Sequence, residues 1–221
     1  VGGYGGLMIA NGGSVSNTNG TIAILAGSTG TVTVNGAGST WTNASELSVG
    51  LGGAGTLAIS NGGSVSSVSA VIGGLAGSTG AVTVDGAGST LVNSLYPVLV
   101  GDFGSGTLDI TNGGQVSGEG IIVGNHLGAS GIVTVDGPGA SWTGSGGAVI
   151  GYSGSGELRI QNGGVFSNTI GSLGANGAAT VDGAGSQWIN SSFLEVGRSG
   201  AATLDITNGG SVSNTNGTIA I

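Results

Sequence analysis

Large apolar residues alternate with small or polar residues over short segments along the whole chain. The segments 31–34 (TVTV), 107–110 (TLDI) and 203–206 (TLDI) are three examples. Such alternation is typical of half-buried β-strands. No window sustains the 3.6-residue period of a helix, and glycine costs about 1 kcal/mol at each helical position. The pattern therefore predicts an all-β protein.

Two turn motifs recur at regular distances between these strands. An Asn-Gly-Gly motif has separations of 50, 51, 50 and 46 residues and begins at Asn11, Asn61, Asn112, Asn162 and Asn208. A second motif, Asn/Asp-Gly-Ala/Pro-Gly, follows the first by 24, 24, 24 and 20 residues and begins at Asn35, Asp85, Asp136 and Asp182. The repeat is thus a double coil of about 50 residues, made of two alternating coils of about 25. Asn, Asp and Gly suit turns because they tolerate a positive φ or close an Asx-turn.

Apolar residues also recur from coil to coil, which predicts columns of stacked core side chains. The first column is Val34, Ile59, Val84, Ile110, Val135, Ile160, Val181 and Ile206. The second column is Val15, Trp41, Val65, Leu91, Val116, Trp142, Phe166, Trp188 and Val212. The third predicted column is Ile22, Leu47, Ile72, Val98, Val123, Ala148, Leu194 and Ile219.

Three columns predict three strands per coil and a parallel β-solenoid, a right-handed β-helix, of about nine coils. A single coil cannot bury its own inward face, so stacking creates the core. A collagen helix is excluded because glycine does not occupy every third position. An antiparallel sandwich is the main alternative, but the strand patterns match best at one-coil and two-coil separations. Residues 1–221 are therefore expected to form one solenoid segment, an excerpt of a longer chain.

Three local features carry separate expectations. Four residues are missing between Asn162 and Asp182, which predicts a shortened third strand near Ile170. One extra residue near Tyr96 and Pro97 predicts a β-bulge. Stacked corner asparagines are expected to hydrogen-bond into ladders along the axis.

The composition excludes several classes of partner. Only 5% of the residues are charged and the formal net charge is −8, so there is no basic face for a nucleic acid. No apolar run approaches the roughly 20 residues of a membrane span, and the segment is not expected to insert into a membrane. There is no cysteine, which excludes disulfides and thiolate metal sites.

The chain offers little that predicts catalysis. Its only histidine, His126, lies in a turn, where a solvated role is more common than that of a catalytic base. A glycosidase needs clustered carboxylates, whereas the corner residues Asp85, Asp136 and Asp182 recur only in every second coil. One carboxylate per corner also falls short of a calcium cage, although weak calcium binding there stays open. Asp109, Arg159 and Asp205 share one outward position and could form an axial charge row. We therefore expect no enzyme activity, no cofactor and no metal.

The repeat resembles a known one. The segments 106–117 (GTLDITNGGQVS), 131–142 (GIVTVDGPGASW) and 149–151 (VIG) are similar to the repeat associated with type V secretion and PEP-CTERM proteins. The resemblance covers essentially the whole chain. It implies an autotransporter-like passenger or giant adhesin, exported to the extracellular surface of a bacterium.

These observations predict a rigid structural stalk in a bacterial surface adhesin or fibre. A glycan-binding adhesin module and a carbohydrate-active β-helix enzyme are the alternatives. Residues 11–24 recur unchanged as residues 208–221, an offset of 197 residues (208 − 11). We therefore expect the partner to be the protein itself, through axial stacking or covalent continuation into a fibre, with surface glycans as a second partner.

Overall fold

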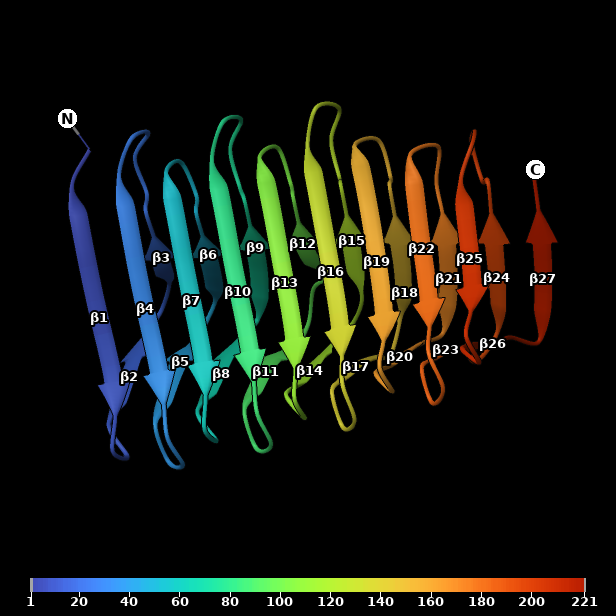
Figure 1. Ribbon diagram of the computed structural model, residues 1–221. Helices are drawn as coiled ribbons and strands as arrows, with labels where there is room; N and C mark the ends of the chain where they lie inside the picture. The colour runs from blue at the N-terminus through green and yellow to red at the C-terminus, as the bar shows by residue number, and fades with distance from the viewer. Residues whose placement is uncertain (1, 221) are drawn as a thin grey trace.

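The computed structural model describes residues 2–220, which wind into a parallel β-solenoid of nine coils (Figure 1). Each coil contributes one strand to each of three nine-stranded sheets, and the described residues contain no helix. In Figure 1 the first-sheet strands run downward at the front and the third-sheet strands run upward at the back, while successive coils advance from left to right. The winding is therefore right-handed, and the predicted fold class is confirmed.

The three sheets hold 27 strands, and every pairing is parallel. The first sheet consists of β1 (Tyr4–Ala10), β4 (Thr29–Asn35), β7 (Ala54–Ser60), β10 (Thr79–Asp85), β13 (Ser105–Thr111), β16 (Ser130–Asp136), β19 (Ser155–Gln161), β22 (Gly177–Asp182) and β25 (Thr203–Thr207). The second sheet consists of β2 (Ser14–Asn17), β5 (Thr40–Asn43), β8 (Ser64–Ser67), β11 (Thr90–Asn93), β14 (Gln115–Gly118), β17 (Ser141–Gly144), β20 (Val165–Asn168), β23 (Gln187–Asn190) and β26 (Ser211–Ser213). The third sheet consists of β3 (Gly20–Ile22), β6 (Glu46–Val49), β9 (Ser69–Ile72), β12 (Val98–Val100), β15 (Ile121–Val123), β18 (Gly147–Ile150), β21 (Ile170–Leu173), β24 (Phe193–Val196) and β27 (Asn216–Ile219).

Each coil turns at three corners. Corner 1 joins a first-sheet strand to a second-sheet strand, corner 2 leads from there to the third sheet, and corner 3 leads to the next coil. Coil 1 comprises β1 to β3, coil 2 comprises β4 to β6, and so on to coil 9, which comprises β25 to β27.

The first column stacks in the predicted register along the first sheet. Seven of its eight residues, from Val34 to Val181, are fully buried. The eighth, Ile206, is 48% exposed, because β25 is the last strand of its sheet and has a neighbour on only one side. Ile206 therefore faces the core direction but is not buried, which corrects its assignment as a core residue.

The second column stacks as predicted and carries the bulkiest core side chains. Trp41, Trp142 and Trp188 are all buried. Trp142 stacks on Phe166 with ring centroids 5.8 Å apart, and Phe166 meets Trp188 edge-on at 6.3 Å. Both distances lie in the range that aromatic pairs prefer. The aromatic column therefore runs without a break through coils 6, 7 and 8.

The third predicted column is wrong, because it mixes two columns of the third sheet. Ile22 is aligned with Val49, not with Leu47. One inward column is Ile22, Val49, Ile72, Val100, Val123, Ile150, Leu173, Val196 and Ile219. The other is Gly20, Leu47, Ala70, Val98, Ile121, Ala148, Gly171, Leu194 and Gly217. Each short third strand thus contributes two inward residues.

The second of these columns varies in size because it faces the aromatic column. A Cβ added to Gly20 would lie 2.5 Å from the ring of Trp41, and one added to Gly171 would lie 2.8 Å from the ring of Trp188. Real atoms do not approach so closely, so glycine makes room for these two indoles.

The two predicted length irregularities lie mainly in corners; of the four missing residues, three are missing from a corner and one from β22, which has six residues. β21 keeps four residues, and the deletion instead shortens corner 3 of coil 7 to residues 174–176, where coils 1, 3 and 5 have 23–28, 73–78 and 124–129. Similarly, no bulge forms at Pro97: the extra residue lengthens corner 2 of coil 4 to residues 94–97, and β12 pairs regularly on both sides. Surface corners accept length changes because they are outside the ladders of both neighbouring coils.

Candidate functional site

The five Asn-Gly-Gly asparagines lie at corner 1, where their backbone is left-handed. Their φ angles are 50–54° in Asn11, Asn61, Asn112, Asn162 and Asn208. The glycine that follows each asparagine also has a positive φ. Asparagine is among the few residues that adopt this conformation readily, and glycine does so without steric cost. The composition of the motif follows from the geometry of the corner.

The Asn or Asp of the second turn motif accepts a hydrogen bond from the side chain of the asparagine in the next coil. The Nδ2 groups of Asn61, Asn112, Asn162 and Asn208 donate to the Oδ1 atoms of Asn35, Asp85, Asp136 and Asp182, at 2.6–2.7 Å. These bonds join coils 2 with 3, 4 with 5, 6 with 7, and 8 with 9. The expected hydrogen bonds along the axis are therefore present in the described residues, but as separate pairs, one per double coil, and not as ladders.

Two of the corner carboxylates accept a second side-chain bond. The hydroxyl of Thr111 donates to Asp85, and that of Thr207 donates to Asp182, each at 2.6 Å. The hydrogen bond from Thr111, followed by that from Asn112, lowers the pKa of Asp85. The pKa of Asp182 is lowered by the bond from Thr207 and then by that from Asn208. The corner carboxylates therefore act as hydrogen-bond acceptors between coils.

A buried serine forms hydrogen bonds with the backbone at corner 1. Ser39, Ser89 and Ser186 donate to the backbone carbonyl of Asn35, Asp85 and Asp182, respectively, at 2.6–2.8 Å. The same hydroxyls accept the backbone N–H of Gly12, Gly62 and Gly163 in the neighbouring coil, at 3.0–3.1 Å. Coil 6 has the buried Ala140 at this position instead. Coil 6 therefore lacks the two hydrogen bonds that this serine forms in coils 2, 4 and 8.

A buried amide network at corner 2 was missed by the sequence reading. The indole N–H of Trp41 donates to Asn17 at 2.8 Å, and that of Trp188 donates to Asn168 at 2.9 Å. Each of these asparagines also donates to an asparagine in the Trp-bearing coil, as Asn168 does to Asn190 at 2.7 Å. The signal was present, since an Asn ends the strand of one coil and Trp-x-Asn follows in the next. These hydrogen bonds join neighbouring coils in the interior of the solenoid.

Coils 5 and 6 lack this network. Gly118 occupies the position of Asn168, and Gly144 occupies that of Asn190. The indole Nε1 of Trp142 is consequently buried without a hydrogen-bond partner among the described residues.

The one histidine lies in an exposed cluster at corner 3. His126 stacks on Phe103, with ring centroids 3.7 Å apart, and its Nδ1 is 3.1 Å from Oδ1 of Asp102. Asn125 donates to the same oxygen at 2.7 Å. Tyr152 is 61% exposed at corner 3 of the next coil. We call Asp102, Phe103, Asn125, His126 and Tyr152 the corner 3 patch.

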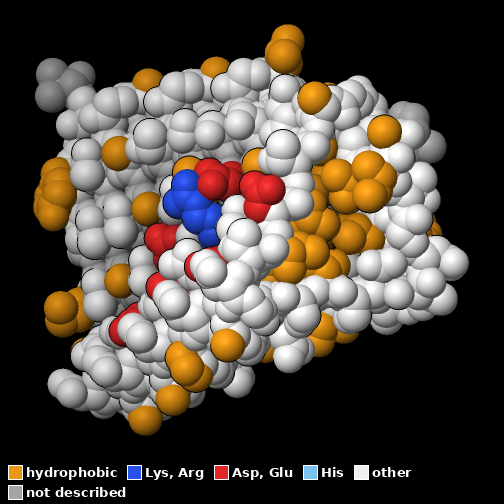
Figure 2. Space-filling view, turned by 45° about the vertical axis from the view of Figure 1, so that its right-hand side comes forward, with side chains coloured by type: hydrophobic (Ala, Val, Ile, Leu, Met, Phe, Trp, Pro, Cys, Tyr) orange, Lys and Arg blue, Asp and Glu red, His pale blue; other side chains and the backbone are white. Residues whose placement is uncertain are grey.

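The charged residues of the outer face gather on the first sheet, where Figure 2 shows blue side chains beside red ones. Arg159 binds Glu157 of its own strand, with Nε 2.7 Å from Oε1. This hydrogen bond raises the pKa of Arg159. Asp109 and Asp205 are in register with Arg159, but Thr134 and Thr180 stand between them. The predicted row therefore has threonine between its charges. No group of three potential metal ligands occurs in residues 2–220.

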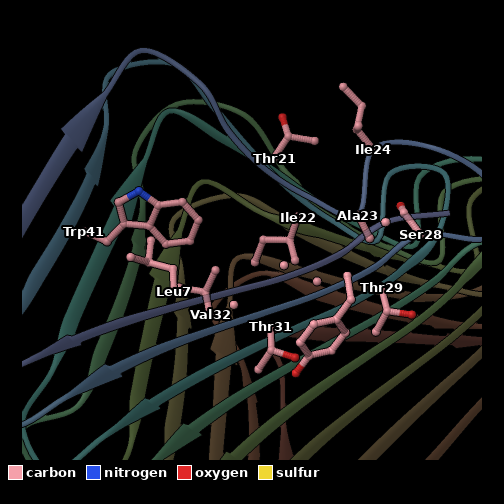
Figure 3. A pocket seen from close by; sticks show the side chains of 15 residues that line it. Leu7, Thr21, Ile22, Ala23, Ile24, Ser28, Thr29, Thr31, Val32 and Trp41 are labelled. Atoms are coloured by element: carbon pink, nitrogen blue, oxygen red, sulfur yellow. The ribbon is translucent and has the colours of Figure 1, made fainter.

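Two hollows lie at the two ends of the solenoid. One lies beside coil 1, where Figure 3 shows Leu7, Ile22, Val32 and Trp41 around it. The other lies beside coil 9 and is lined by Leu194, Leu204, Ile206 and Val212; orange side chains gather at this end in Figure 2. Both are lined by residues of the inward columns, so they are exposed stretches of core rather than polar clefts. No helix that could cross a membrane occurs in the described part of the chain.

No protein-family profile matches the chain, and no curated protein matches its sequence. A crystal structure of a TibC-catalysed, hyper-glycosylated fragment of TibA, residues 55–350, aligns over 99% of this chain and 100% of that chain, with 18% identity and a TM-score of 0.21. A TM-score of that size does not superimpose the two backbones. The resemblance to the repeat of type V secretion and PEP-CTERM proteins stays a prediction.

Proposed function

We propose that this chain is a rigid, elongated structural segment of an extracellular bacterial surface protein, and that it has no catalytic role. The observation that carries this proposal is the continuity of all three sheets through nine coils. Bending such a rod would strain three parallel ladders and a close-packed core at once. Its stiffness therefore follows from the way the coils stack.

Side-chain bonds between coils add to this stiffness. The corner 1 pairs and the amide network of corner 2 each join one coil to the next, and the bonds of Asn168 are buried. Buried hydrogen bonds between side chains of neighbouring coils favour one register over its alternatives, although Nδ2 of Asn190 has no partner among the described residues. The coils are thus held against sliding as well as against separation.

Small-angle X-ray scattering tests the rod. Nine strands at about 4.8 Å should span roughly 40 Å along the axis, and a chain with twice as many coils should be twice as long. A doubled chain whose maximum dimension stays well below twice the single value would contradict a rigid stalk.

We further propose that the block of residues 11–207 is repeated in tandem in the parent protein. Residues 11–24 and 208–221 are identical at an offset of 197 residues (208 − 11). Asn214 in coil 9 therefore corresponds to Asn17, which accepts a hydrogen bond from the indole N–H of Trp41 in coil 2. A second block placed after coil 9 would meet the same surface that coil 2 meets on coil 1, and the two coil types would keep alternating.

Two engineered chains test this continuation. One joins two blocks at the natural offset, and its control lacks one coil at the junction, so that coil 8 meets coil 2 and two coils of one type are adjacent. We expect the first chain to unfold in a single transition at a higher temperature than its control. Equal melting temperatures would count against continuation by alternating coils.

Glycan binding is the second candidate function, because the corner 3 patch has suitable chemistry. Exposed aromatic rings stack on sugar rings, and the carboxylate of Asp102 and the amide of Asn125 are hydrogen-bonding groups for hydroxyls. A glycan array is the direct measurement. Binding that is lost in Phe103→Ala and Tyr152→Ala, but kept in Leu25→Ala at the same edge, would support the patch; binding that is unchanged in all three variants would exclude it.

A further inference from the structure

The Asn-Gly-Gly corners contain the two adjacent groups needed for spontaneous deamidation. The backbone nitrogen of a glycine can attack the side-chain carbonyl carbon of the asparagine before it, since glycine has no Cβ to hinder the approach. All five corners share nearly the same φ, 50–54°, and all five asparagines are exposed. The φ angle and the solvent access of the asparagine therefore do not distinguish one corner from another.

The chemistry needs only water. A bond forms between the glycine nitrogen and Cγ of the asparagine, the bond from Cγ to Nδ2 breaks, and the glycine N–H proton leaves with the nitrogen as ammonia. Water then opens the resulting five-membered succinimide at either carbonyl. The products are aspartate and isoaspartate, and no oxidant or reductant takes part.

What does distinguish the corners is the partner of the attacking nitrogen. The N–H groups of Gly12, Gly62 and Gly163 donate to the buried hydroxyls of Ser39, Ser89 and Ser186 at 3.0–3.1 Å. The equivalent serine in coil 6 is replaced by Ala140, and Gly113 N–H has no acceptor among the described residues. A nitrogen held by a serine must first break that bond to reach Cγ, whereas Gly113 is free of it.

Asn112 and Asn162 form a matched pair for this comparison. Their φ angles are 52° and 53°, and each donates Nδ2 to the carboxylate of the preceding coil, Asp85 or Asp136, at 2.7 Å. We propose that Asn112 is the site of spontaneous deamidation among the four corners that a further described coil follows, and that the buried serines protect Asn11, Asn61 and Asn162.

Deamidation at this position would weaken the contact between coils 4 and 5. The Nδ2 donor that Asp85 accepts would become a carboxylate oxygen, so an attraction would turn into a repulsion between like charges. Isoaspartate would in addition lengthen the backbone of a tight corner. Deamidation would therefore weaken the interior coils of the solenoid first at the contact between coils 4 and 5.

The test is incubation of the folded protein at mildly alkaline pH, followed by peptide mapping for the gain of one mass unit and for isoaspartate. We expect Asn112 to react about two- to tenfold faster than Asn162, the factor that corresponds to one ordinary hydrogen bond. Ala140→Ser should slow Asn112 to the rate of Asn162. Ser89→Ala should speed Asn61 by a similar factor, which keeps the proposal testable if the Ala140 variant does not fold.

Unfolded protein in denaturant is the control, and there the two asparagines should react at similar rates. Equal rates at Asn112 and Asn162 in the folded protein would overturn the proposal. It would also be overturned if neither serine substitution changed the rate at its own corner.

Discussion

Coils 5 and 6 have the same strands and register as coils 7 and 8, but they lack polar side chains that join the latter pair. Where coils 7 and 8 have an amide at each end of the Trp188 network, coils 5 and 6 have glycine, and the indole of Trp142 stays unpartnered. At corner 1 the methyl group of Ala140 stands where Ser186 has a hydroxymethyl group. The three positions are Gly118, Gly144 and Ala140 in one pair, against Asn168, Asn190 and Ser186 in the other.

This difference distinguishes the apolar columns, which form the solenoid, from the polar side-chain bonds between coils, which add stability. Trp142 is as deeply buried as Trp188, and β17 pairs with β20 in the register that β20 then keeps with β23. The apolar columns are thus sufficient to stack the coils. The polar bonds between coils are optional additions, and each one lost leaves a donor or acceptor that burial penalises.

The largest expected effect concerns what the two pairs share. Val135→Asp in coil 6 and Val181→Asp in coil 8 should each cost more than about 4 kcal/mol, because either change buries an unpaired charge. Denaturant unfolding measures both free energies. Thr33→Asp, which points outward on the same sheet, is the control and should be mild. If one core variant were tolerated, the columns would not carry both pairs alike.

A smaller effect should separate the two pairs. Asn168→Ala should cost about 2–3 kcal/mol, since it leaves the buried indole N–H of Trp188 and the Oδ1 of Asn190 without partners. Gly118→Ala changes the equivalent position in coil 5, where no side-chain bond exists to be lost, and should stay within about 1 kcal/mol. Similar losses in both variants, measured by thermal and denaturant unfolding, would mean that the amide network contributes nothing.

The missing bond should also be restorable. Gly118→Asn should stabilise the protein by about 1 kcal/mol, because it supplies an acceptor for Trp142 and removes the freedom of glycine from the unfolded chain. A Cβ at this position would meet its nearest atoms at 3.4 Å, which is ordinary contact. A lower melting temperature in this variant would show that coil 5 cannot accommodate the amide.

The smallest effect is a dependence on pH at corner 1. The pKa values of Asp85 and Asp182 are lowered in the folded state. Their contribution to stability is therefore complete above the pKa of the unfolded chain, near 3.8, and is lost as the pH falls through the lower folded value. Thr111→Val removes the first cause at Asp85, so this variant should lose less stability than the parent protein between neutral pH and strongly acidic pH.

Melting temperatures at several pH values provide the measurement. Asp136 is a natural reference in coil 6, because it accepts a side-chain bond from Asn162 while Gln161 stands where Thr111 and Thr207 stand in the other coils. An identical acid response in the parent and in Thr111→Val would contradict a role for the threonine.

The architecture could be predicted because a solenoid repeats its local rules. Alternation marked the strands, the spacing of Asn-Gly-Gly marked the coils, and the positions of Val34 and Trp41 marked two columns that the structure reproduces. The third column was misread since the third strands are short and carry two inward residues each, so positions two residues apart, such as Leu47 and Val49, are both apolar. Periodicity alone cannot choose between them.

Local periodicity therefore dictated the strands, the turns and the parallel stacking, because each depends on neighbouring residues or on the repeat length. Only the tertiary structure determined which side chains form hydrogen bonds between neighbouring coils. Asn168 and Trp188 are 20 residues apart. Ala140 and Gly113 likewise lie in neighbouring coils, at the start of the paired strands β17 and β14. Whether a buried donor meets an acceptor depends on side-chain positions across the stack, and a change of one residue, as at Ala140, removes a bond without disturbing the pattern.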